Sequence, residues 1–90
     1  MDTDDLDLRR LRGFCEVARE RSFTRAARKL FLTQPAISLQ LKALEEQLGA
    51  RLLERGRQGV RVTPAGEVLL RRAVEVFAQL DAARDEIAGL

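Results

Sequence analysis

The chain has 90 residues, of which 46% are apolar and 33% are charged, a composition that suits one small folded domain and differs from that of disordered segments. It contains no histidine, tyrosine or tryptophan and a single cysteine, which excludes an internal disulfide, histidine-assisted nucleophiles and the common zinc sites, so we expect no enzyme, no catalytic residue, no metal and no cofactor. The net charge of +2 is unevenly distributed, because residues 1–7 carry −4, residues 8–63 carry +8 and residues 64–90 carry −2, and a basic central block favours a polyanionic partner.

Two helices are predicted at the start of the chain. Apolar residues at spacings of three and four indicate a first helix over residues 6–21. Ser22 then has the character of an N-cap for a second helix over residues 23–30. The apolar stripe of the first helix holds Leu8, Leu11, Cys15 and Ala18.

A third helix is predicted over residues 34–48. Thr33 would cap it, Pro35 lies in its first turn, where a missing N–H costs nothing, and Gly49 follows its end. Its buried stripe would consist of Ile37, Leu41, Leu44 and Leu48. Two short helices joined by a tight turn, the second one amphipathic and capped, form a helix-turn-helix.

The periodicity changes after Gly49, and a β-hairpin is predicted. Its strands would cover residues 51–55 and 60–62, with Gly56 and Gly59 in the turn and Val60 and Val62 facing inward. A hairpin that follows a helix-turn-helix is a wing. Arg57 would lie at its tip, and Arg55 and Arg61 on its strands.

A long final helix is predicted from Pro64, after the cap Thr63, onward to the glycine at position 89. Apolar residues repeat in it at alternating spacings of four and three, which is the pattern of a coiled-coil seam. The seam holds Leu69, Ala73, Val76, Leu80, Ala83, Ile87 and Leu90. A second stripe, of Leu70, Val74 and Phe77, covers only the first half. A helix packed solely on its own domain would leave the distal seam residues without contacts, so we expect a homodimer through this helix.

The face of the third helix opposite its buried stripe is unusual for a solvated helix. At 100° per residue this face runs through Pro35, Leu39, Lys42 and Glu46, with Ala36 and Ser38 on its flanks, and its N-terminal part is small and largely uncharged. Slim, largely uncharged side chains of this kind suit a helix that enters the DNA major groove. Taken singly, each of these residues is more often an ordinary solvent-exposed residue, but the set together with the basic central block and the wing favours DNA.

Several polar side chains have specific partners in this interpretation. Gln34 can pair with adenine, Ser38 can donate to or accept from several bases, and Lys42 suits phosphate or guanine. Hydroxyls near helix N-termini, where exposed N–H groups favour phosphate, belong to Ser22, Thr24 and Thr33.

The segment "SFTRAARKLFLTQPAISLQLKALEEQLGARLLER", followed by "GVRVTPAG", resembles the N-terminal DNA-binding domain of LysR-type transcriptional regulators. The pattern covers residues 8–66, and the helix after it resembles the linker helix of that family. The resemblance implies a mainly α winged helix-turn-helix with a two-stranded β-hairpin wing and a long C-terminal linker helix. By position, the base-facing residues would be Gln34, Pro35, Ala36, Ser38 and Leu39, and the backbone contacts Ser22, Thr24, Thr33, Lys42, Arg55 and Arg57. The resemblance also places the wing, with Arg61 on its second strand, at the DNA backbone or minor groove. Leu39 stands where family members vary and often carry a polar or basic group. Because leucine is apolar, it is expected to contact a thymine methyl group.

The resemblance also implies a domain organisation. Residues 1–63 would form the DNA-binding domain and residues 64–90 the linker helix. Family members normally continue into an effector-binding domain, so this chain is expected to be a piece of a longer protein without that domain and without a small-molecule effector site. Such a longer protein could assemble into a tetramer.

The sequence therefore predicts a bacterial transcription factor domain that binds double-stranded DNA as a dimer on an interrupted dyad. The alternative is a helical protein–protein adaptor that uses the seam over residues 69–90, and a small enzyme or a different winged-helix regulator is disfavoured. No apolar run reaches the roughly 20 residues that a membrane span needs, and the acidic start is unlike a secretory signal. A cytoplasmic location without membrane contact is expected.

Overall fold

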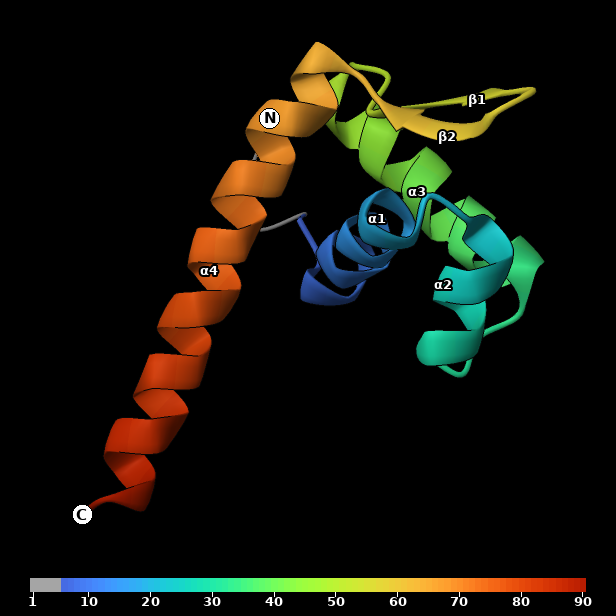
Figure 1. Cartoon of the computed structure of the whole chain (residues 1–90). Coiled ribbons are helices and arrows are strands. Elements are labelled where there is room, and N and C mark those ends of the chain that lie inside the picture. Colours follow the sequence, from blue (N-terminus) through green and yellow to red (C-terminus); the bar gives the residue numbers. More distant parts are fainter. Residues whose placement is uncertain (1–5) are drawn as a thin grey trace.

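The computed structural model describes residues 6–90 and contains four helices and one hairpin in that part of the chain (Figure 1). The elements are α1 (Leu8–Glu20), α2 (Phe23–Lys29), α3 (Gln34–Leu48), β1 (Leu53–Gly56), β2 (Gly59–Val62) and α4 (Pro64–Ala88). The order confirms the mainly helical winged helix-turn-helix. The acidic residues at positions 2, 4 and 5 lie outside the described residues.

Capping side chains determine where the helices begin. The Ser22 hydroxyl accepts a hydrogen bond from Arg25 N–H at 3.1 Å, and the Thr33 hydroxyl accepts one from Ala36 N–H at 3.2 Å, as the sequence predicts. The first helix begins at Leu8 rather than at residue 6, because the carboxylate of Asp7 accepts the N–H of Arg9 at 2.7 Å and caps the helix there. Gly49 ends α3 with φ of 66°, a conformation that favours glycine.

The turn between α2 and α3 contains no glycine or proline. Phe31 instead adopts a left-handed conformation with φ of 57°, and its side chain is 95% exposed. The backbone N–H of Leu32 donates to the carbonyl of Ala27 at 2.9 Å and closes the turn. The chain therefore reverses through one residue in a conformation that bulky side chains seldom adopt.

The three N-terminal helices enclose the core together with the hairpin. Its most deeply buried large side chains are Phe14, Val17, Ile37, Leu44 and Leu52. α1 crosses α3 closely at Gly13, where an added Cβ would lie 2.9 Å from Gln40 Oε1. The stripe predicted for α3 is confirmed, since Ile37, Leu41 and Leu44 are buried and Leu48 packs against the core.

The hairpin is antiparallel and closes through a two-residue turn at positions 57 and 58. Its first strand begins at Leu53 rather than at residue 51, because the N–H of Leu52 donates to the carboxylate of Glu45 in α3 at 2.7 Å. Val60 is buried as predicted and Val62 packs against the core, while Arg61 pairs with Glu54 in register across the hairpin. The Glu45 contact fixes the base of the wing to the third helix.

α4 begins after Thr63, whose hydroxyl accepts the N–H of Gly66 at 3.0 Å and donates to the carbonyl of Arg51 at 2.6 Å. Only its first half packs on the body, and residues 78–90 are all exposed. Figure 1 shows the orange-to-red helix leaving the other elements and ending far from them. The helix therefore extends an amphipathic surface beyond the domain.

Candidate nucleic-acid interface

The residues predicted to face bases lie together on the outer side of α3. Gln34 and Pro35 are exposed in its first turn, and the Leu39 side chain is 68% exposed one turn later. Ala36 and Ser38 are half-buried on the flanks of the same side. Residues 34–42 contain no acidic side chain, so this half of α3 presents a slim surface without negative charge.

Gln34 is held by the neighbouring helix. The hydroxyl of Thr24 in α2 donates a hydrogen bond to Gln34 Oε1 at 3.2 Å. The amide carbonyl thereby uses one of its two lone pairs, and the amide NH₂ group keeps both donors for an outside acceptor. Thr24, expected to contact phosphate, therefore also orients Gln34, a side chain predicted to face bases.

Ser38 is held by the wing. Arg55 Nη2 donates to Ser38 Oγ at 3.1 Å, and the guanidinium carbon lies 3.8 Å from the centre of the Phe23 ring. In this structure Arg55 is thus folded onto α2 and α3 rather than extended from the wing. Phe23 was not among the predicted site residues, because its distance from Arg55 in the sequence hides the contact from any local pattern.

The other residues predicted to contact the DNA backbone differ in whether they already cap a helix or form an ion pair within the domain. Ser22 and Thr33 cap helices, and Arg61 forms an ion pair with Glu54 at 3.7 Å. Lys42 and Arg57 are exposed and form no ion pair within residues 6–90. Among the predicted backbone contacts, Lys42 on α3 and Arg57 at the wing tip are therefore cations available to an outside anion.

One acidic residue near α2 is neutralised within the domain. Lys29 forms an ion pair with Glu20, and the hydrogen bond from its ammonium group holds the pKa of the Glu20 carboxyl below its usual value. The same hydrogen bond raises the pKa of Lys29. Both groups remain charged at neutral pH, and the end of α1 is tied to the end of α2.

The seam predicted on α4 divides into two parts. Ala73 is 1% exposed and belongs to the core, and Leu69 packs against that core, so these two residues serve the chain's own domain. Exposed seam residues are Val76, Leu80, Ala83, Ile87 and Leu90. The sequence pattern therefore overestimated how much of the seam is exposed, because α1 covers the first part of it.

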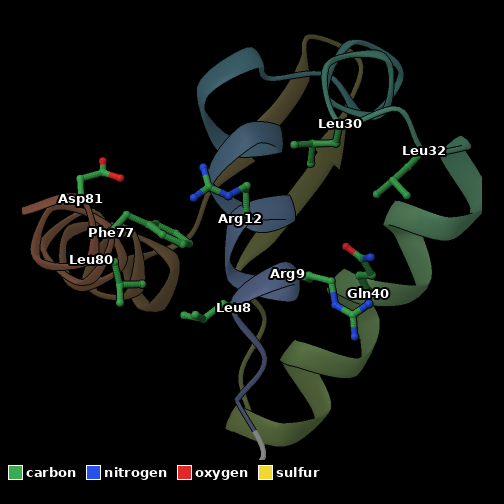
Figure 2. Close-up of a pocket in the computed structure, with 9 residues that line it drawn as sticks. All are labelled: Leu8, Arg9, Arg12, Leu30, Leu32, Gln40, Phe77, Leu80 and Asp81. Atoms are coloured by element: carbon green, nitrogen blue, oxygen red, sulfur yellow. The ribbon is translucent and has the colours of Figure 1, made fainter. Parts of the chain in front are cut away.

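A cavity of about 400 Å³ lies beside the exposed part of α4. Figure 2 shows Leu8 of α1 and Phe77 and Leu80 of α4 lining it, with Leu30 and Leu32 from the turn region across from them. Arg9, Arg12, Gln40 and Asp81 complete its wall. Apolar surface therefore continues from α4 onto the body of the domain.

No cluster of histidine, cysteine, aspartate and glutamate suitable for a metal ion is present in the part of the chain that the structure describes. Within residues 6–90, none of the helices is long and apolar enough to cross a membrane.

Comparison with known proteins gives a consistent result. The family model "bacterial regulatory helix-turn-helix protein, lysR family" matches residues 8–67. The chain is 46% identical over 85 residues to the HTH-type transcriptional regulator BudR of Klebsiella aerogenes, covering 94% of this chain and 59% of that protein. It is 46% identical over 83 residues to the HTH-type transcriptional regulator HdfR of Yersinia enterocolitica, covering 92% of this chain and 28% of that protein.

Among solved structures, the chain is similar to the BenM DNA-binding domain crystallised with catB site 1 DNA. The TM-score is 0.88 at 41% sequence identity, and the match covers 92% of this chain and 93% of that one. The likeness therefore extends over the hairpin and most of α4, and at this identity it is more than a shared fold.

Proposed function

The chain belongs to the lysR family of bacterial regulatory helix-turn-helix proteins, and on this premise we propose that it reads double-stranded DNA as a dimer, with α3 in the major groove. The family consists of transcriptional regulators and not of enzymes, and DNA binding is the activity of a domain of this kind. The choice of groove, the base contacts and the dimer are our proposals.

The observation that carries the proposal is the outer surface of α3 beside the wing. Its first nine residues are free of acids, and their outer side is exposed next to the hairpin. A helix sinks into a groove about 12 Å wide only if that side is slim. This exposed surface has no packing role and no negative charge, and base edges offer the hydrogen bonds and the methyl groups that match its side chains.

Each side chain has a role in this arrangement. The amide donors of Gln34 suit acceptors on adenine or guanine, and Leu39 suits a thymine methyl group. Lys42 and Arg57, which have no ion-pair partner within the described residues, would bind phosphates. The helix N-termini at Ser22 and Thr33 add backbone N–H groups that favour phosphate.

We propose a dimer that forms through the exposed part of α4. Leu80, Ile87 and Leu90 leave apolar surface uncovered in the monomer, and Leu8 continues it on α1. Two copies of α3 would then bind half-sites about 34 Å apart, or a multiple of that distance, on an interrupted dyad. Chromosomal DNA lies in the bacterial cytoplasm, and we place the protein there.

The domain division at residues 63 and 64 is also a proposal. The chain spans 59% of the length of BudR and 28% of HdfR. An effector-binding domain and a tetramer would belong to a longer protein of this family.

Selection from a random pool of double-stranded oligonucleotides, at two salt concentrations, tests the proposal. We expect enrichment of a dyad and an affinity that falls steeply with salt, because each phosphate contact releases counterions. Leu39→Arg should change the preferred base at one position of each half-site. Gln79→Arg adds the same charge on exposed α4 and serves as the control.

Salt-sensitive binding without an enriched sequence would contradict specific reading by α3. Equal tightening on every sequence in Leu39→Arg would contradict the thymine contact. Negligible affinity for any DNA at modest salt would favour the adaptor that uses α4 alone.

A further inference from the structure

Three elements meet at the guanidinium group of Arg55. The residue lies on β1 of the wing, stacks on Phe23 at the start of α2, and donates through Nη2 to Ser38 of α3. The Phe23 ring is buried and belongs to the core, so it forms a fixed platform. A planar guanidinium can stack by its face and still donate from its edge, and Arg55 does both.

The contact has a consequence for Ser38. One lone pair of the hydroxyl oxygen accepts from Arg55, and the positive charge turns the hydroxyl proton away from the guanidinium. Ser38 then offers a donor to its surroundings. The same interaction holds the wing at a set distance from α3.

Arg55 differs in this respect from the arginine at the wing tip. Arg57 is exposed and has no ion-pair, ring or hydrogen-bond partner within residues 6–90, whereas Arg55 has two partners on two helices. A cation that serves only a phosphate needs neither partner. The partners of Arg55 therefore indicate that it acts on the side of α3 that is proposed to face the bases.

We propose that Arg55 is a positioning residue for base reading: by stacking on Phe23 and donating to Ser38, it locks the wing to α3 and makes Ser38 a donor toward acceptor atoms of a base. This inference rests on the proposed function and names a residue that determines specificity without contacting a base.

The first test uses the free protein in solution. Protons of the Arg55 side chain next to the Phe23 ring should have NMR resonances shifted upfield, whereas those of Arg57 in the same spectrum should have ordinary positions. Phe23→Leu keeps an apolar side chain in the core and should return the Arg55 resonances to ordinary positions. Identical shifts for the two arginines in the wild-type protein would overturn the proposal.

The second test measures affinity for the selected operator and for operators changed at one base pair. Discrimination is the ratio of the affinities for the selected and the changed operator. Arg55→Gln should lower this ratio about five- to tenfold, as expected for one hydrogen bond, at the same base pair at which Ser38→Ala lowers it. The effect should vanish when Ser38→Ala is already present, because Arg55 then has no hydroxyl to position. Arg55→Lys should not restore discrimination, since an ammonium group does not reproduce the stacked fork.

Arg57→Gln is the matched control. It should weaken binding to all sequences alike and lower the salt slope by about one, as the loss of a phosphate contact does. If Arg55→Gln behaves in that same way, Arg55 is a phosphate contact and the inference is wrong. A wild-type protein with no preferred sequence would overturn the proposed function and this inference together. If the wild-type protein selects an operator but the Arg55 resonances have ordinary positions, the inference alone is overturned.

Discussion

Cys15 shows how burial controls the chemistry of one side chain. Its thiol lies in the core with 4% of the residue exposed, and desolvation raises its pKa above the ordinary 9.0. The folded thiol keeps its proton to higher pH than the unfolded thiol, so the free energy of unfolding should fall as the pH rises above about 9.

The measurement is the rate of reaction with a thiol reagent at neutral pH. The native protein should react at least about a hundredfold more slowly than the protein in denaturant, because reaction needs both opening and deprotonation. A Cys15→Ala variant should lack this part of the alkaline loss of stability. Equal rates in the native and denatured states would show that the thiol is accessible.

A local sequence pattern identifies residues whose hydrogen-bond partners lie a few positions away in the chain. Ser22 and Thr33 are recognisable as caps because each hydroxyl binds a backbone N–H three residues later. The partners of Gln34 and Ser38 are not recognisable in this way. Thr24 and Arg55 come from other elements, and only the folded chain brings them within hydrogen-bond distance.

Gly66 shows what joins the wing to the long helix. A Cβ at this position would lie 2.2 Å from the carbonyl oxygen of Leu52 and 2.7 Å from Val62 Cγ1. The first turn of α4 therefore packs directly on the backbone at the base of the hairpin. Because a backbone carbonyl moves less readily than a side chain, alanine cannot be accommodated without a shift of the elements.

Gly66→Ala should therefore lower the free energy of unfolding by at least about 2 kcal/mol, toward the upper range for overpacking. For a domain of this size the midpoint of thermal unfolding should fall by roughly 8 °C or more. Gly89→Ala is the control, since its nearest neighbour would be Asp85 O at 3.6 Å. Similar melting temperatures for the two variants would contradict the close contact.

At the scale of elements, the main difference between expectation and structure is the start of the hairpin. The short strand pattern over residues 51–55 predicts a strand that begins two residues too early. Leu52 is buried, as a strand residue would be, but its N–H is directed at Glu45 in α3. Leu52 and Leu53 are both buried, so burial alone does not distinguish a residue that pairs in the hairpin from one whose N–H binds α3.

The whole molecule consists of a packed body and a helix that extends beyond it, with principal extents of 50 × 30 × 20 Å. Leu80 is 47% exposed at the edge of the cavity between α1 and α4. Leu80→Glu should convert the proposed dimer to a monomer, because it places a charge at the centre of an apolar contact. The measurement is the mass in solution together with the melting temperature.

Ala82→Glu adds the same charge on another side of α4 and should leave the dimer intact. The monomeric variant should bind a full dyad no more tightly than a single half-site, at least tenfold more weakly than the wild type, since the two reading helices are no longer linked. A dimer that persists in Leu80→Glu would contradict the interface on exposed α4.

The sequence by itself determined the order of helices and hairpin, three of the four helix starts and the absence of acidic side chains from the first nine residues of α3. These features depend on residues one to four positions apart, whose contacts the backbone geometry already decides. Only the tertiary structure decided that Ala73 is buried while Leu80 is free, and that Arg55 stacks on Phe23. Both outcomes depend on how far α1 reaches along α4 and where the wing lies on α3, and packing between distant segments sets these distances.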